Sequence, residues 1–194
     1  MKAHVLFLSI AASTVCAQTT NYVASPFDSQ NHYGTQDPFL FFTTDAPSAR
    51  YQQVYANTDF SRVQGPLLIS EISFSSGALA LDITVPNVQM SLSTTPKVPD
   101  GLSTTFSENI GADNTLVFSG PLRLFSRGFS TYGVNIPLEH PFLYDPDLGN
   151  LLLEVRNYQT IPPTALNHLL GAAGTLGDSS SLAVALDVNS ETGS

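Results

Sequence analysis

The side chains best placed to do chemistry in this sequence carry oxygen and stand together in residues 145–150. Asp145, Asp147 and Asn150 occur there within the sequence DPDLGN. Ca²⁺ takes about six to eight oxygen ligands, so these three side chains form a candidate metal site. The segment equally suits a hairpin turn, with Asp first, Pro second and Gly beyond them, and it lacks the EF-hand pattern. Calcium binding and simple turn formation are therefore the two interpretations of this segment.

Two tyrosines form a second candidate site, for a sugar ligand. Tyr51 and Tyr55 share one face of an alternating segment, and exposed aromatic rings on a sheet can stack on sugar rings. The chain has no Trp, which offers the largest stacking face. The alternative is that both tyrosines are half-buried strand residues whose hydroxyl groups reach water. A carbohydrate-binding module, acting on an extracellular polysaccharide, is thus one functional hypothesis.

The sequence shows no catalytic motif. It has no Gly-x-Ser-x-Gly nucleophile elbow, and the spacing of its histidines does not match a zinc site. Glycoside hydrolysis needs two facing carboxylates, and sixteen acidic residues do not identify such a pair. The sequence predicts a non-catalytic protein without a cofactor other than Ca²⁺, and a polysaccharide hydrolase or lyase is the remaining alternative. Arg50 and Arg156 are scarce cations, and we expect a buried carboxylate as the partner of each.

The first seventeen residues have the pattern of a secretory signal peptide. Lys2 precedes an apolar run over residues 5–12, and Ala17 precedes the expected cleavage site. The run is shorter than the roughly 20 residues that a membrane-spanning helix needs. A lipoprotein signal ending at Cys16 is disfavoured, because a small residue does not precede that cysteine. We therefore expect a secreted protein, extracellular or at the cell surface, whose mature chain does not span the membrane.

Composition narrows the classes of partner. The formal net charge is −9, and removal of Lys2 with the leader leaves six basic against sixteen acidic residues, or −10. Nucleic acid and anionic membranes need a basic surface, so neither is expected. The sole cysteine lies in the leader, so no disulfide can stabilise the mature chain. Extracellular polysaccharide and surface proteins are the partners that remain.

Period-two alternation predicts an all-β fold, an antiparallel sandwich of jelly-roll type. The expected organisation is a leader over 1–17, an irregular arm over 18–38 and a sandwich domain over 39–194. Short helices are expected at 100–108 and 162–171, and turns at residues 86–87 and 120–121. The ending NSETGS suggests that a further strand or sorting tail is missing. Alternating apolar runs occur in residues 51–55, 67–74, 88–92, 132–138, 151–155 and 182–188, with Leu68, Ile72 and Phe74 expected on one face.

Several short sequence segments give the chain a family resemblance. The matching segments are residues 49–55, 92–95, 100–106, 109–113, 117–120, 141–146 and 149–157. Together they resemble uncharacterised bacterial secreted proteins that often end in a PEP-CTERM sorting tail, over residues 39–193. The chain lacks the Pro-Glu-Pro motif, the apolar helix and the basic end of that tail. The resemblance says almost nothing about activity and supplies no site residues. Together with the export signal and the lack of a catalytic motif, it leads us to expect a non-catalytic protein with a matrix or surface interaction role.

Overall fold

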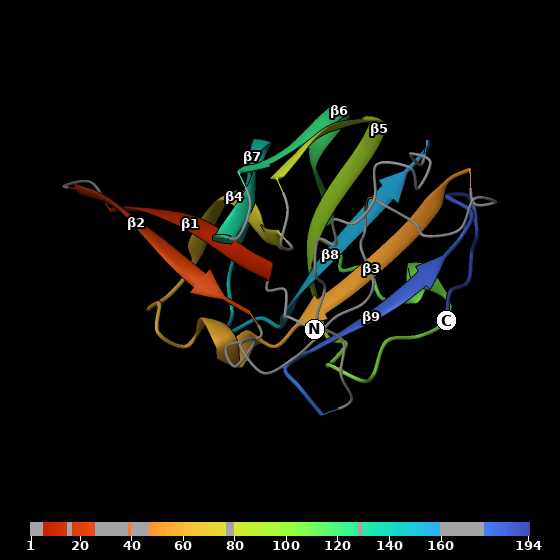
Figure 1. Ribbon diagram of the computed structural model, residues 1–194. Helices are drawn as coiled ribbons and strands as arrows, with labels where there is room; N and C mark the ends of the chain where they lie inside the picture. Colours follow the sequence, from red (N-terminus) through yellow and green to blue (C-terminus); the bar gives the residue numbers. More distant parts are fainter. Residues whose placement is uncertain are drawn as a thin grey trace.

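The computed structural model shows an all-β protein built from two antiparallel sheets (Figure 1). The only helical turns in the described part are two 3-10 turns, η1 (Asn57–Phe60) and η2 (Phe106–Glu108). The fold class predicted from the alternating pattern is thus confirmed. The structure describes residues 6–14, 17–25, 39, 47–76, 80–127, 130–159 and 177–194.

The smaller sheet, sheet A, has the strand order β2-β1-β4-β7. Its strands are β1 (Leu6–Thr14), β2 (Ala17–Ala24), β4 (Leu67–Ser76) and β7 (Ser130–Tyr144). Sheet B has the order β6-β5-β8-β3-β9. It contains β3 (Ala49–Tyr55), β5 (Ala80–Thr95), β6 (Thr115–Arg127), β8 (Asn150–Asn157) and β9 (Ser180–Ala185).

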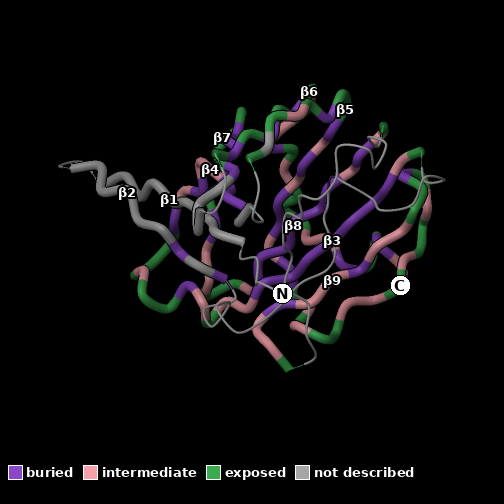
Figure 2. Tube along the Cα trace, viewed as in Figure 1, coloured by how far each residue is buried: buried purple, intermediate pink, exposed green. Residues whose placement is uncertain are grey.

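One hydrophobic core joins the two sheets. Ile72 and Phe74 from sheet A and Met90 and Val155 from sheet B belong to the same cluster of buried side chains. Every residue of β3 is buried, and so is every residue of β8 except Arg156, whereas the adjoining part of β5 has both buried and partly buried residues (Figure 2). Burial of this apolar surface, at about 25 cal/mol per Å², is the main stabilising term in a fold of this kind. The sandwich-like arrangement follows from each sheet presenting an apolar face to the other.

A β-bulge corrects the predicted face of β4. The pairing of β4 with β7 shifts register between Ile69 and Glu71. Leu67 and Ile69 are buried before the shift, and Ile72 and Phe74 after it, whereas Leu68 is only partly buried. A bulge inserts one extra residue and so moves the alternation by one position. Leu68 therefore does not share a face with Ile72 and Phe74, as the simple alternation predicted.

The turns expected at Pro86-Asn87 and Gly120-Pro121 are instead a bend within β5 and β6. Both strands continue through these residues, and their pairing shifts register between Val85 and Val88. Proline cannot donate a ladder hydrogen bond, so it is tolerated where the ladder is interrupted. The bend divides the β5–β6 pair into an inner half against β8 and an outer half at the far end of the molecule (Figure 1).

Several other expectations meet a different structure or lie outside the described residues. Residues 18–24 lie in β2 rather than in an irregular arm, in keeping with the strand preference of the sequence TTNYV. The segment 100–108 holds only η2, because its Ser and Thr residues are poor helix formers. The segment 162–171 is not among the described residues. A helix suited to crossing a membrane does not occur in the described part of the chain.

The outer face of sheet B is covered by two segments. We call residues 96–114 the outer loop and residues 186–194 the C-terminal tail. Phe106 of the outer loop is fully buried, and its amide nitrogen donates to the carbonyl of Glu191 at 3.0 Å. Ser194 and Val184 exchange two backbone hydrogen bonds, each 3.1 Å long. This cover makes sheet B buried on both faces over much of β3 and β8.

Candidate functional site

The segment 145–150 forms the turn between β7 and β8. The amide of Leu148 donates to the carbonyl of Asp145 at 3.1 Å, which closes a β-turn. The Oδ1 atom of Asp145 accepts from the amide of Asp147 at 3.1 Å, as in an Asx turn. Both aspartates thus lie in a turn whose local hydrogen bonds account for their positions. The turn interpretation describes this geometry without an ion.

Asn150 is committed to structural bonds at both ends of its amide. Its Oδ1 atom accepts from the backbone amide of Asn57 at 2.8 Å, and its Nδ2 atom donates to the carbonyl of Lys97 at 2.8 Å. One of the two lone pairs of Oδ1 is thus already used by a backbone amide. Among the described residues, a group of three or more His, Cys, Asp or Glu side chains placed to hold a metal does not occur. Asp145 and Asn150 thus already have structural hydrogen-bond roles here, and calcium binding by Asp145, Asp147 and Asn150 stays a prediction.

A surface hollow of about 440 Å³ opens beside this turn. Phe60, Val63, Pro146 and Asp147 are among its lining residues. Tyr144 packs edge-on against Phe60, and its hydroxyl donates to the carbonyl of Gly149 at 2.8 Å. Burial raises the pKa of Tyr144 well above its ordinary value, and the carboxylates of Asp145 and Asp59 add to the shift. The phenol is thus held neutral as a structural donor.

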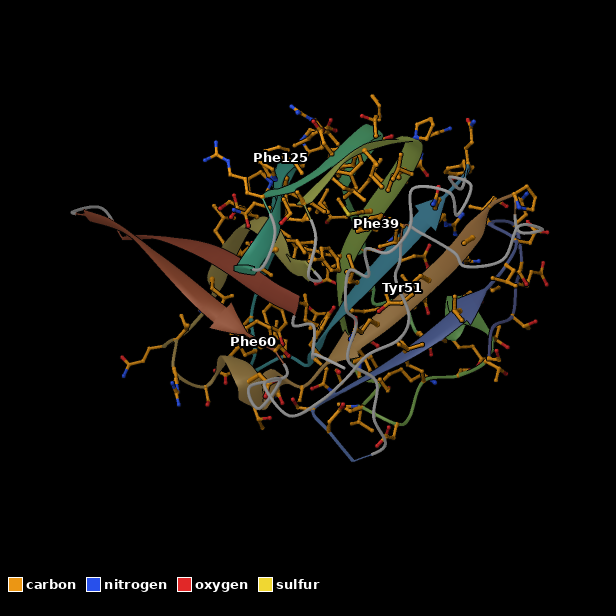
Figure 3. All side chains as sticks on the ribbon, viewed as in Figure 1. Phe39, Tyr51, Phe60 and Phe125 are labelled. Atoms are coloured by element: carbon orange, nitrogen blue, oxygen red, sulfur yellow. The ribbon has the colours of Figure 1, made fainter. Side chains whose placement is uncertain are left out.

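The tyrosines that the sequence offered for sugar binding lie inside the core. Tyr51 is 1% exposed and Tyr55 is 3% exposed. Their hydroxyl groups donate to the same atom, Oε1 of Gln53, at 2.5 and 2.8 Å. The prediction that they share a face is confirmed, but both side chains belong to the hydrophobic core that also contains side chains of sheet A. Figure 3 labels Tyr51 on β3. Neither ring can stack on a sugar in this fold, which corrects the ligand-binding role proposed for them.

The charged side chains that the described structure buries are Arg50 and Glu154. Nη2 of Arg50 lies 3.1 Å from Oε2 of Glu154, and Nε of Arg156 lies 2.6 Å from Oε1. Register explains the arrangement, because Arg50 is the direct cross-strand partner of Arg156, and Gln52 that of Glu154. We call Arg50, Gln52, Glu154 and Arg156 the buried ion cluster. The expectation that Arg50 and Arg156 pair with a buried carboxylate is confirmed.

The buried ion cluster fastens the outer loop and the C-terminal tail to sheet B. Gln52 donates to Glu154 and to the carbonyl of Phe106, and it accepts from Nδ2 of Asn109 at 2.9 Å. The guanidinium of Arg50 lies 4.6 Å from the ring centre of Phe106 and donates to the carbonyl of Ser190 at 3.0 Å. Its Nε atom is buried without a hydrogen-bond partner. The side-chain oxygens of the cluster accept hydrogen bonds from internal donors. The cluster therefore has a structural role.

A different group of exposed residues was missed by the sequence reasoning. Arg123 and Asp82 form a two-point ion pair, with N···O distances of 2.7 and 2.9 Å, on the outer half of β5–β6. Phe125 stands beside them and is 44% exposed. The sequence signal available for this group was an aromatic residue, Phe125, with one arginine two positions before it and another two positions after it. The direct pairing of Asp82 with Phe125 across strands could be known only from the register.

Comparisons with models of protein families, with curated proteins and with solved structures give no match for this chain.

Proposed function

We propose that this chain is a secreted, non-catalytic protein that works outside the cell, or at its surface, through contacts with matrix components. Three observations support the proposal. The leader pattern of residues 1–17 directs the chain to export, and the acidic composition suits a soluble extracellular surface. The resemblance to secreted bacterial proteins points the same way.

The buried ion cluster is the main structural observation behind the proposal that the protein is non-catalytic. A catalytic carboxylate must reach the substrate, within hydrogen-bond distance of the proton that it transfers. Both oxygens of Glu154 instead accept from internal donors on Arg50, Arg156 and Gln52. The side chain is 7% exposed, beneath the outer loop. Its position therefore serves to hold the outer loop and the C-terminal tail on sheet B.

An incubation with insoluble polysaccharide tests this role. The purified chain is mixed with extracellular matrix or cell-wall polysaccharide, and both the bound protein and the newly formed reducing ends are measured. We expect protein in the pellet and reducing ends at the level of a protein-free blank. Reducing ends that rise in proportion to protein, or an unsaturated sugar product, would instead establish a hydrolase or lyase. Protein that stays wholly in the supernatant would contradict the interaction role.

A further inference from the structure

The outer half of the β5–β6 pair carries an exposed aromatic ring between two arginines. Along β6, the side chains of residues 122, 124 and 126 are buried, while Arg123, Phe125 and Arg127 are exposed. Asp82 lies directly across from Phe125 on β5. We call Asp82, Arg123, Phe125 and Arg127 the arginine–phenylalanine patch. Figure 3 shows Phe125 near the top of the view, away from Tyr51 and Phe60.

Arg123 is held in place and still has N–H donors available for a ligand. Its Nε and Nη2 atoms donate to the two oxygens of Asp82, and its guanidinium lies 5.2 Å from the ring centre of Phe125. A guanidinium has five N–H donors, so three remain without a partner among the described residues. The carboxylate and the ring fix the orientation of the fork before a ligand arrives, which lowers the entropic cost of binding.

Arg127 supplies an uncompensated charge at the other side of the ring. Its side chain is exposed, and an ion pair to it does not occur in the described structure. Successive outward residues of a strand are about 7 Å apart, so the two arginines flank Phe125 over about 13 Å. The chain has only seven Lys and Arg residues and a net charge of −9. Two of those seven in one five-residue segment make this a local cationic site on an acidic molecule.

We propose that the arginine–phenylalanine patch binds a carboxylated sugar unit of an extracellular polysaccharide. The exposed part of the Phe125 ring would cover the apolar face of the sugar ring. Arg123 and Arg127 would pair with its carboxylate and with that of a neighbouring unit, since guanidinium and carboxylate match as two-point partners. This inference rests on the proposed extracellular role and names the chemistry of the partner.

Charge explains why a uronic acid polymer fits better than a more densely charged chain. Nucleic acid carries about one negative charge per 1.7 Å and is bound by many cations at once. This patch has two arginines, one of them already paired with Asp82, on a strongly acidic protein. At physiological ionic strength charges are screened over about 8 Å, so the patch acts on the sugar units in contact with it. A ring that also buries apolar sugar surface supplies the remaining attraction.

Affinity gel electrophoresis of the purified full chain tests the inference. The protein is run in native gels containing polygalacturonate, neutral dextran or double-stranded DNA. We expect retardation by polygalacturonate alone, weakened by added NaCl. Phe125→Ala, and separately the pair Arg123→Gln with Arg127→Gln, should each weaken binding about tenfold. Leu143→Ala, at a residue that is 66% exposed on β7, is the matched control and should bind like the parent.

Three results would overturn the inference: equal retardation by dextran, equal retardation by DNA, or unchanged binding by the patch variants. The variants lie at the surface, and equal thermal midpoints would show that they fold like the parent. The assay uses purified protein from any compartment, so its outcome does not depend on export. Loss of the extracellular role and loss of sugar binding at this patch are therefore separate results.

Discussion

Buried polar side chains in this protein hold strands and loops together, and Glu154 is the clearest example. Its carboxylate compensates the buried guanidinium of Arg50 and also meets Arg156 and Gln52. Glu154→Ala would leave Arg50 buried without its partner, which costs about 3–5 kcal/mol of unfolding free energy. Urea unfolding measures the loss. Asp82→Asn, in the exposed pair with Arg123, is the control and should leave the midpoint nearly unchanged; equal losses in the two variants would contradict this assignment.

The buried tyrosines set a pH limit on stability. Burial raises the pKa of Tyr55 well above its ordinary value, and Tyr51 adds to the shift. Above about pH 10 the unfolded chain releases a proton that the native state keeps, so the free energy of unfolding falls as the pH rises further. Tyr55→Phe removes that proton, and the slope of unfolding free energy against pH should become shallower above pH 10. Urea unfolding at a series of alkaline pH values checks this, and parallel slopes for parent and variant would contradict it.

At the scale of elements, the outer loop depends on a close approach to β5. A Cβ atom at Gly111 would overlap the carbonyl oxygen of Thr94, and the Gly111 amide donates to Oγ of Ser93 at 3.1 Å. Gly111→Ala should therefore push the end of the loop off the sheet and cost about 1–3 kcal/mol, as overpacking does. Asn114→Ala, at an exposed position of the same loop, is the control. Hydrogen exchange should quicken in residues 106–113 of the glycine variant alone; unchanged exchange would show that the loop adapts.

The sequence predicts elements better than it predicts their surroundings. Val88, Met90 and Leu92 alternate and are buried as expected, because one face of an antiparallel strand packs on the core. The burial of Tyr51 could not be predicted in this way, since alternation separates two faces but does not show that both faces of β3 are covered. The pairing of Arg50 with Glu154 needed the register of β3 against β8. Bulges and long-range register are set by tertiary packing, so they are not visible in a single segment.

At the scale of the whole molecule, cleavage of the expected leader would change the strand order of sheet A. Cleavage after Ala17 would remove β1, which lies between β2 and β4. The remaining chain keeps an anchor at the end of β2, because Val23 is buried and Ser25 donates to Asp59 in η1. β4 would then keep β7 as its partner on the other side. A chain cleaved there would thus keep sheet B with its cover and a sheet A without β1.

The most direct test of the extracellular account is the N-terminal sequence and location of the chain expressed with its own first residues in a secreting bacterium. We predict that the protein accumulates outside the cytoplasm and begins at Gln18. Glu71 and Phe74 would then lie on an open edge of β4, and their region should exchange amide hydrogens faster than β8 does. Full-length protein that stays in the cytoplasm with its leader uncut, and with β4 protected as strongly as β8, would contradict the account.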